Sequence, residues 1–332
     1  MKKKATVIGE GAWGTAVAML LASNNYEVML WCHDEHVVTT IKKNHSNDHY
    51  LPGFTLSQLI IPTHDMRLAM EHSDYIFEAI PVKYLRSVIT DARTFAQPDH
   101  VWISLSKGIE VQSLQFPAQI IQELVGRDAP IVVVAGPSFA QEVAQKKITA
   151  LTIASKDCEV ALCVQKMLAN SYIKPYTSTD VMGTQIGSAL KNVISLGIGI
   201  ADGSGLSENS KAFIFTRGLR EIMLVTQKLG GRQETIMGLS GIGDLVMSAF
   251  GSLGRNRACG KLLGQGKSLS EIEKEYVVLP ESINTTRSLY EIINKHHLNM
   301  PVCVGIYRIV FENGSIHNVL ADLMEGPSEQ EC

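Results

Sequence analysis

The sequence has no run of about 18 consecutive apolar residues, so no membrane-spanning helix is predicted from it. It also has few cysteines, and none of them shows C-x-x-C spacing, which excludes a zinc ribbon or a disulfide scaffold and fits reduced thiols in a cytosolic enzyme. The 10 histidines form no H-E-x-x-H or similar ligand spacing, so no metal site is predicted. The six cysteines are Cys32, Cys158, Cys163, Cys259, Cys303 and Cys332.

Charge of one sign is not in large excess either. The 30 lysines and arginines against 33 acidic residues give a net charge of −3, which excludes a general attraction for nucleic acid or an acidic membrane surface. The lysines at the start precede no apolar stretch with a cleavage site, so we interpret them as a solubilising lead-in rather than a signal peptide. Any anion must therefore be bound by a local site.

The length of 332 residues exceeds what one ordinary core supports, so two domains are expected. The first half alternates short β-branched apolar runs with amphipathic segments such as Thr15–Ser23 and Leu114–Val125. This alternation predicts an α/β fold of Rossmann type with a mostly parallel sheet. The predicted strands are Ala5–Ile8, Val28–Cys32, Tyr75–Ala79, Val101–Leu105, Ile131–Ala135 and Ala150–Ala154.

The second half has a different texture, because helical spacing replaces the β-branched runs. Helical segments are expected at 186–200, 208–229, 256–265, 281–297 and 303–324. We therefore predict a dinucleotide-binding domain over residues 1–187 and an all-helical C-terminal domain over 188–332. The first long helix would begin at the boundary between them, where ligand sites are favoured.

Three glycines near the start, Gly9, Gly11 and Gly14, have G-x-G-x-x-G spacing. A strand precedes them and a helix and a second strand follow, as a dinucleotide-binding βαβ unit requires. In that unit the pyrophosphate lies against N–H groups at the start of the helix. The alternative is a glycine-rich turn without a ligand. The glycine-rich stretches at 238–245 and 264–266 follow no strand and are not assigned this role.

The end of the second strand indicates which cofactor is used. Asp34 lies about twenty residues past the glycines, where an acid binds a free ribose 2′-hydroxyl, but His33 precedes it and could approach a 2′-phosphate. Both NAD and NADP therefore remain open as cofactors. His33 could also be a solvated loop residue.

Lys191 is the residue most suggestive of chemistry. Its helical neighbours include no carboxylate, so we expect an uncompensated ammonium that loses hydration near a cleft and whose pKa is lowered. Such a lysine is a candidate general acid/base. The alternative is a lysine whose stem covers apolar surface while its ammonium stays in water.

Other polar residues lie where ligands bind in related folds. Lys107 and the segment Gly136-Pro137-Ser138 follow predicted parallel strands, at the sheet edge where open α/β proteins bind ligands. Each could also be ordinary turn chemistry. Farther on, Arg255, Asn256 and Arg257 begin a predicted helix and could bind a phosphate or be a solvated basic cap.

A short acid between glycines, Asp244, is the last polar candidate in the second half. It could orient a lysine ammonium or a substrate hydroxyl, or it could cap a helix.

Taken together, the motifs resemble those of bacterial NAD(P)-dependent sn-glycerol-3-phosphate dehydrogenases almost from end to end. The motifs match not only individually but also in their order and spacing. They read VIGEGAWGTAVA, LWCHDEH, SLSKGIE, AGPSFAQEVA, GSALKNVISLGIGIADG, TRGLREI, MGLSGIGDLVMSAFGSLGRNRACG and INTTRSL.

The resemblance implies reversible hydride transfer between NAD(P)H and dihydroxyacetone phosphate, with Lys191 as general acid/base. It also implies a cytoplasmic homodimer that supplies phospholipid synthesis, with NADPH slightly favoured in the biosynthetic direction. The implied cofactor-binding residues are Gly9, Gly11, Trp13, Gly14, His33, Lys107, Ala140, Arg255, Leu279 and Glu281. The implied substrate-binding residues are Lys107, Gly136, Ser138, Lys191, Asp244, Gly254, Arg255 and Asn256.

Two positions depart from the family pattern. The family usually has serine where this chain has Gly254, so a phosphate donor there is either a backbone amide or absent. Leu279 and Pro280 appear inserted before Glu281, which alters one wall of the implied cofactor site. Neither departure touches Lys191.

Two other functions remain as alternatives. A sibling enzyme with the same plan could oxidise a β-hydroxy acid or a sugar acid, although the Arg-Asn pattern favours phosphate over carboxylate. A redox-sensing protein could bind NAD(P)H without turnover, and Lys191 argues against that reading.

Overall fold

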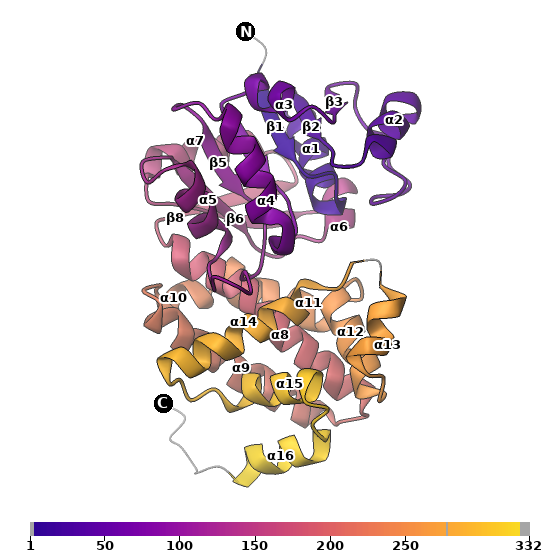
Figure 1. Ribbon diagram of the computed structural model, residues 1–332, viewed down its shortest axis with the longest axis vertical. Helices are drawn as coiled ribbons and strands as arrows, with labels where there is room; N and C mark the ends of the chain where they lie inside the picture. The colour runs from indigo at the N-terminus through magenta and orange to yellow at the C-terminus, as the bar shows by residue number, and fades with distance from the viewer. Residues whose placement is uncertain (1–2, 277, 326–332) are drawn as a thin grey trace. The chain divides into compact units, whose positions relative to one another are not determined.

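The computed structural model describes residues 3–276 and 278–325. Contacts divide the chain into two compact units, each with its own core (Figure 1). The first contains the chain up to Lys107 together with Gln115–Gln185, and the second contains Gly108–Leu114 and the residues from Ile186 onward. Each unit is described separately below.

The first unit is built on one eight-stranded sheet with the order β3-β2-β1-β4-β5-β6-β7-β8 (Figure 1). All neighbouring strands are parallel except β6 and β7, which confirms the predicted mostly parallel sheet. The strands are β1 (Lys3–Ile8), β2 (Tyr26–Trp31), β3 (Ile60–Thr63), β4 (Tyr75–Glu78), β5 (Val101–Ser104), β6 (Ile131–Ala135), β7 (Thr149–Ser155) and β8 (Ile173–Ser178).

Two of these strands, β3 and β8, were not predicted, and both lie at the edges of the sheet. Each contains a proline, Pro62 in β3 and Pro175 in β8. Proline cannot donate to a strand ladder and is therefore tolerated on edge strands, where it weakens the sequence signal. In β8 the outward-facing residues are exposed, so the apolar run that marked the central strands is missing.

Helices cover both faces of this sheet, because successive strand residues point to opposite sides. Val7 belongs to a core shared with α1 (Ala12–Ser23), α2 (Glu35–Asn44), α6 (Ala140–Ala144) and α7 (Cys158–Leu168). Ile8 belongs to a second core shared with α3 (Met66–His72), α4 (Val82–Ala92) and α5 (Pro117–Val125). This double coverage explains why the central strands read as continuous apolar runs.

The described residues of the second unit form helices, turns and loops, as predicted. The predicted segment 303–324 is interrupted, however, because Asn313 takes a left-handed φ of 53° and Gly314 follows it. The helices are α8 (Val181–Gly203), which begins within the first unit, α9 (Glu208–Lys228), α10 (Gln233–Ile236), a π-helical turn (Leu239–Gly243), α11 (Asp244–Phe250), α12 (Arg255–Gly264), α13 (Leu269–Glu275), α14 (Glu281–His296), α15 (Pro301–Phe311) and α16 (Ile316–Glu325).

A short excursion of the chain, Gly108–Leu114, belongs to the second unit although its neighbours in sequence belong to the first. Ile109 and Glu110 in it are buried. The Ser288 hydroxyl on α14 donates to the backbone oxygen of Ile109 at 3.2 Å. The helical unit is therefore assembled from two separate stretches of chain.

Helices α8 and α12 approach each other closely along a stripe of glycines. A Cβ atom built on Gly199 or Gly203 of α8 would lie 2.1 Å from a backbone oxygen of α12. A Cβ on Gly260 of α12 would likewise lie 2.1 Å from the oxygen of Leu196, and one on Gly264 would meet α8 at 2.2 Å. Real Cβ atoms do not come this near, so only glycine allows this crossing. The stripe fixes the position of α12 on α8.

A buried carboxyl group holds the start of α15. Glu221 on α9 is 4% exposed and accepts the N–H groups of Val302 at 2.7 Å and Cys303 at 2.9 Å. Burial raises the pKa of Glu221 to about 7, against the lowering effect of these hydrogen bonds. This group therefore couples helix packing to pH.

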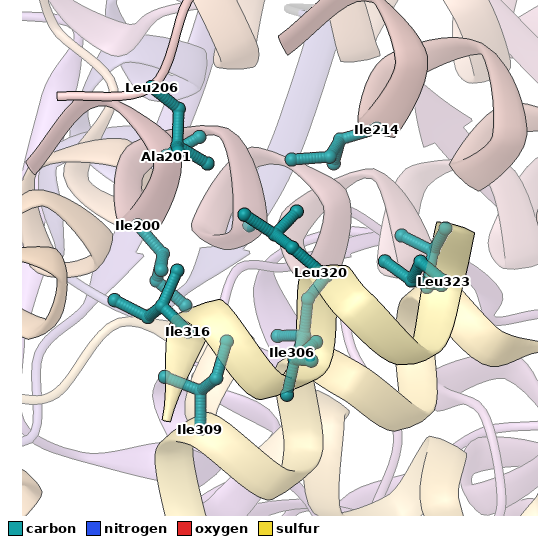
Figure 2. A pocket seen from close by; sticks show the side chains of 12 residues that line it. Ile200, Ala201, Leu206, Ile214, Ile306, Ile309, Ile316, Leu320 and Leu323 are labelled. Carbon is teal, nitrogen blue, oxygen red and sulfur yellow. The ribbon is translucent and has the colours of Figure 1, made fainter. Parts of the chain in front are cut away.

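The second unit also encloses a small apolar cavity of about 30 Å³. Figure 2 shows side chains of α8, α9, α15 and α16 that line it, including Ile200, Ile214, Ile306 and Leu320. This volume is about one water molecule's share of the liquid, far less than a triose phosphate needs. We interpret the cavity as a packing gap between helices.

Over residues 3–276 and 278–325, no three His, Cys, Asp or Glu side chains gather as a metal site would need. In this part of the chain no single helix has the length and apolar character to cross a membrane, although the bent pair Gln233–Phe250 and Arg255–Gly264 has both by length and composition.

Candidate active site

The glycine turn after β1 has the geometry of a phosphate cradle. Gly9 has a φ of +115°, and a Cβ there would lie 2.7 Å from the oxygen of Ala79, while a Cβ on Gly14 would lie 2.0 Å from the oxygen of Gly9. The space above Gly11 is open, with no atom within 4 Å of a built Cβ. Gly11 is also the N-cap of α1, and no side chain caps that helix. The N–H groups of its first turn therefore face a position suited to an anion.

Trp13, in the first turn of α1, has a buried hydrogen-bond donor without an acceptor among the described residues. The donor is its indole Nε1. Trp13 packs against the same core as Ala140, the first residue of α6. A buried indole N–H normally has an acceptor, so an absent ligand explains it best. The glycine cradle and this orphan donor together fit a bound dinucleotide.

Lys107, Gly136 and Ser138 come together at the carboxyl ends of β5 and β6, as their positions in the sequence predicted. The Lys107 ammonium and the Ser138 hydroxyl each donate to the backbone oxygen of Gly136 at 3.1 Å. Gly136 has a φ of +133°, which favours glycine, and a Cβ would lie 3.1 Å from the oxygen of Ala150. A cation, a hydroxyl and a turn backbone are thus gathered at the ligand-binding edge of the sheet.

Lys191 lies in the middle of α8 and is buried together with an acid from α11. Its Nζ donates to Asp244 Oδ1 at 2.8 Å and to the Ser248 hydroxyl at 2.6 Å. The side chains of Lys191 and Asp244 are 8% and 0% exposed. The prediction of an uncompensated ammonium is therefore wrong, because the carboxylate comes from another helix. The alternative in which the ammonium stays in water is also wrong, because Nζ donates to two buried side chains.

The backbone before Asp244 explains how the acid reaches Lys191. The π-helical turn Leu239–Gly243 leads directly into α11, of which Asp244 is the first residue. Gly187, one turn before Lys191 on α8, comes so close to this turn that a Cβ would lie 2.7 Å from the oxygen of Ser240. Single π-helical turns are frequent at functional sites. Here the turn places a carboxylate against a lysine 53 residues away in sequence.

The first residues of α12 form a polar group next to this pair. Asn256 donates from Nδ2 to Asn192 Oδ1 at 2.8 Å, so it contacts the residue that follows Lys191. Its Oδ1 accepts the N–H of Ser282 at 3.2 Å. The exposed Arg255 donates to the backbone oxygen of Val278 at 2.6 Å. Both side chains therefore stand at a helix start, where anions are favoured.

Arg257 has a different environment from Arg255. Its Nε donates to Asp202 Oδ2 at 2.6 Å, and Lys211 pairs with the other oxygen of the same carboxylate at 3.0 Å. These bonds tie α12 to α8 and α9. Arg257 thus supports the helix packing, and Arg255 is the better candidate for an anion.

The surroundings of Gly254 leave little room for a side chain. Gly254 is the N-cap of α12, and a Cβ there would lie 2.7 Å from the oxygen of Ser248. A side chain does not fit without a shift of the backbone. Only a backbone amide can donate from this position.

Leu279 and Glu281 flank the start of α14. Pro280 is its N-cap and Glu281 its first residue, an arrangement in which an acid complements the helix dipole. Leu279 is half-buried. Their predicted role in cofactor binding stays a prediction.

At the end of β2, His33 is exposed and its ring lies 6.1 Å from that of Trp31. The Asp34 side chain caps α2, since its Oδ1 accepts the N–H of His36 at 2.7 Å. The Glu10 carboxylate accepts the N–H groups of both His33 and Asp34.

Five residues of these networks were not singled out from the sequence: Glu10, Asn192, Asp202, Lys211 and Ser248. Ser248 carried a usable signal, because it follows Asp244 by four positions and so lies on the same helix face. Asn192 and Glu10 carried none, since their partners come from distant segments.

The chain matches two family models, the N-terminus of NAD-dependent glycerol-3-phosphate dehydrogenase over residues 4–161 and its C-terminus over residues 180–321. A Bacillus pumilus relative named glycerol-3-phosphate dehydrogenase (NAD(P)+) is 38% identical over 97% of this chain and 94% of its own. A Bacillus cereus relative of the same name is 36% identical over 97% and 95%. The crystal structure of glycerol-3-phosphate dehydrogenase from Coxiella burnetii aligns with a TM-score of 0.93 and 28% identity, covering 98% of this chain and 99% of that one. The chain therefore belongs to the NAD-dependent glycerol-3-phosphate dehydrogenase family.

Proposed function

We propose that this chain catalyses the reversible reduction of dihydroxyacetone phosphate to sn-glycerol 3-phosphate with NAD(P)H. The observation that carries the proposal is the buried Lys191, held by Asp244 and Ser248 and adjoined by the Arg255–Asn256 pair through Asn192. A proton donor and a phosphate-binding helix start are thereby linked within one helical unit. Family membership supplies the substrate and the cofactor class.

Lys191 acts as the general acid in the reducing direction. A nicotinamide cofactor held by the first unit would supply the hydride that the central carbon of the substrate needs. Lys191 Nζ gives a proton to the carbonyl oxygen as the C=O bond becomes C–OH. In the reverse direction the neutral amine takes this proton back. Asp244 and Ser248 fix the direction of Nζ. The positive charge of the Lys191 ammonium stabilises the oxyanion as it develops.

Phosphate recognition falls to the start of α12. The guanidinium of Arg255 carries five N–H donors, and its bond to Val278 uses one of them. Asn256 adds an amide, and Gly254 offers its backbone rather than a hydroxyl. A phosphate dianion suits this donor set better than a carboxylate does, because it has more acceptor oxygens.

Cofactor binding falls to the first unit, with the phosphates on the glycine cradle of Gly9, Gly11 and Gly14. Apart from the excursion Gly108–Leu114, residues 1–187 are then the proposed dinucleotide-binding domain and 188–332 the proposed substrate-binding and catalytic domain. Lys107 serves both cofactor and substrate, and Gly136 and Ser138 hold the substrate. The remaining cofactor contacts are Trp13, His33, Ala140, Arg255, Leu279 and Glu281.

The proposed setting is the cytoplasm, with the chain acting as a homodimer that supplies glycerol phosphate for phospholipid synthesis. Five cysteines, all in the described part of the chain, are free thiols, as a reducing compartment favours; Cys332 lies outside that part. Light scattering on the purified protein tests the dimer, since a monomeric mass would contradict it.

The deciding experiment is a steady-state assay with dihydroxyacetone phosphate against short oxo acids, followed by the absorbance of the reduced nicotinamide. We expect turnover with the triose phosphate only. Preference for an oxo acid would replace the proposal by the sibling activity. Cofactor binding without any turnover would instead favour a redox sensor.

A further inference from the structure

The glycine turn contains a carboxylate that the sequence did not explain. Glu10 stands between Gly9 and Gly11 and is 7% exposed. Its Oε2 accepts the backbone N–H of His33 at 3.1 Å, and its Oε1 accepts that of Asp34 at 3.2 Å. One side chain of the first βα turn therefore takes two amide donors at the end of β2.

This strand end is where a dinucleotide-binding fold recognises the adenosine ribose. An acid there accepts the 2′-hydroxyl of NAD, whereas donors there accommodate the 2′-phosphate of NADP. The acid normally belongs to the second strand, but here the Asp34 carboxylate caps α2. Glu10 supplies the carboxylate at this place from the neighbouring strand.

The main chain that carries this carboxylate is held in place. The backbone oxygen of Glu10 accepts the Thr15 hydroxyl at 2.9 Å and the Asn47 side-chain amide at 2.8 Å. Asn47 also donates to Thr15 at 2.8 Å and is 1% exposed. A buried, satisfied network of this kind keeps the turn in one arrangement.

The local charge is predominantly negative. Residues 32–36 and 63–65, which follow β2 and β3, include acids and histidines but no lysine or arginine. Besides burial, the Glu10 and Asp34 charges raise the pKa of both Tyr50 and Cys32. In these two stretches a phosphate dianion would meet the acids with only histidines as possible cations.

We propose that Glu10 is the residue that selects NAD(H) over NADP(H). Its carboxylate occupies the two amides that a 2′-phosphate would use and repels the added charge, while a ribose 2′-hydroxyl can donate to it. The inference rests on the proposed function for its kinetics, but it concerns cofactor binding itself. It departs from the slight NADPH preference that the family resemblance implies.

The test is a fluorescence titration of the full-length protein with NADH and with NADPH. We expect the wild type to bind NADPH about tenfold or more weakly than NADH, since hydrogen bonds to charged groups are at stake. Glu10→Ala removes the charge and frees both amides, so it should lower this ratio about tenfold, chiefly by tightening NADPH. Glu10→Gln keeps the size of the side chain and should move the ratio in the same direction by less.

Glu35→Gln is the matched control. Glu35 is exposed at the start of α2, and its carboxylate has the same charge but does not take the two amides. Its removal should change the ratio by less than about twofold, because solvent screens exposed charges. A circular dichroism melting curve identifies any variant that fails to fold, in which case Glu10→Gln carries the test.

The proposal is overturned if the wild type binds both cofactors equally. It also fails if a folded Glu10 variant keeps the wild-type ratio, or if Glu35→Gln shifts it as far as Glu10→Gln does. Failure of the proposed function looks different. In that case dihydroxyacetone phosphate is not turned over with either cofactor, while the two binding constants still respond to Glu10.

Discussion

Replacing Lys191 by methionine should separate two roles that the structure assigns to one buried ion pair. The ammonium is 2.8 Å from Asp244, and the two side chains are 8% and 0% exposed. Removing it leaves a carboxylate without its cation in a region closed to water. Both stability and turnover should therefore fall, each for its own reason.

The magnitudes follow from burial and from the proposed chemistry. Breaking a buried pair by removing one partner costs about 3–5 kcal/mol of unfolding free energy. Loss of a positioned acid lowers kcat by about 100- to 10,000-fold. Asp244→Asn should destabilise by a similar amount, because it removes the carboxylate that lies 2.8 Å from the ammonium. The double variant should lose much less than the sum, since both partners of this ion pair are then gone.

Urea unfolding, followed by far-ultraviolet circular dichroism of the helices, measures the stability of all four proteins. Kinetics with dihydroxyacetone phosphate measures turnover, and NADH titration checks that cofactor affinity persists. In the double variant, stability should recover while kcat does not. Additive stability losses would refute the ion pair, and a Lys191→Met enzyme that keeps most of its kcat would refute the acid/base role.

Three further outcomes are expected. Trp13→Phe removes the unpartnered indole N–H but keeps a ring, so NADH should bind about three- to tenfold more weakly by titration; unchanged affinity would mean that the cofactor does not use this donor. Gly260→Ala pushes a methyl group against the oxygen of Leu196, so the melting temperature should fall and KM for the triose phosphate should rise as α12 shifts; a variant like wild type in both would contradict the close crossing. The raised pKa of Glu221 means that its contribution to stability is full below its ordinary value of 4.5 and is lost as pH rises through about 7. Urea unfolding across this range should therefore show a wild-type stability that declines relative to Glu221→Gln, and parallel curves would exclude the effect.

Much of the fold could be predicted because the central strands and the long helices carry strong periodic patterns. The six predicted strands all exist, and their buried runs reflect helices on both faces of the sheet. The edge strands β3 and β8 were not predicted, because Pro62 and Pro175 weaken the strand pattern in the sequence. The break before α16 escaped because helical spacing persists across Asn313, whose left-handed backbone is a local event.

Some residues of the candidate site could likewise be predicted from the local sequence, and others could not. Residues that follow strands or begin helices, such as Lys107, Ser138 and Arg255, could be found because position in an element suggests a role. The partner of Lys191 could not be predicted in this way. Asp244 reaches Lys191 through a π-helical turn, and the glycines of that stretch allow such a turn but do not indicate it in the sequence. The role of Glu10 could not be predicted for a similar reason. Its hydrogen bonds to the end of β2 depend on the register between β1 and β2.

The excursion Gly108–Leu114 makes the order of synthesis matter. A truncated chain starting at Ile186 would lack Ile109, a buried residue, and the carbonyl that receives Ser288. On a ribosome this piece emerges long before the helices that need it, so it must wait exposed until α14 is made. Co-expression of a Gly108–Leu114 peptide should therefore improve the recovery of such a fragment.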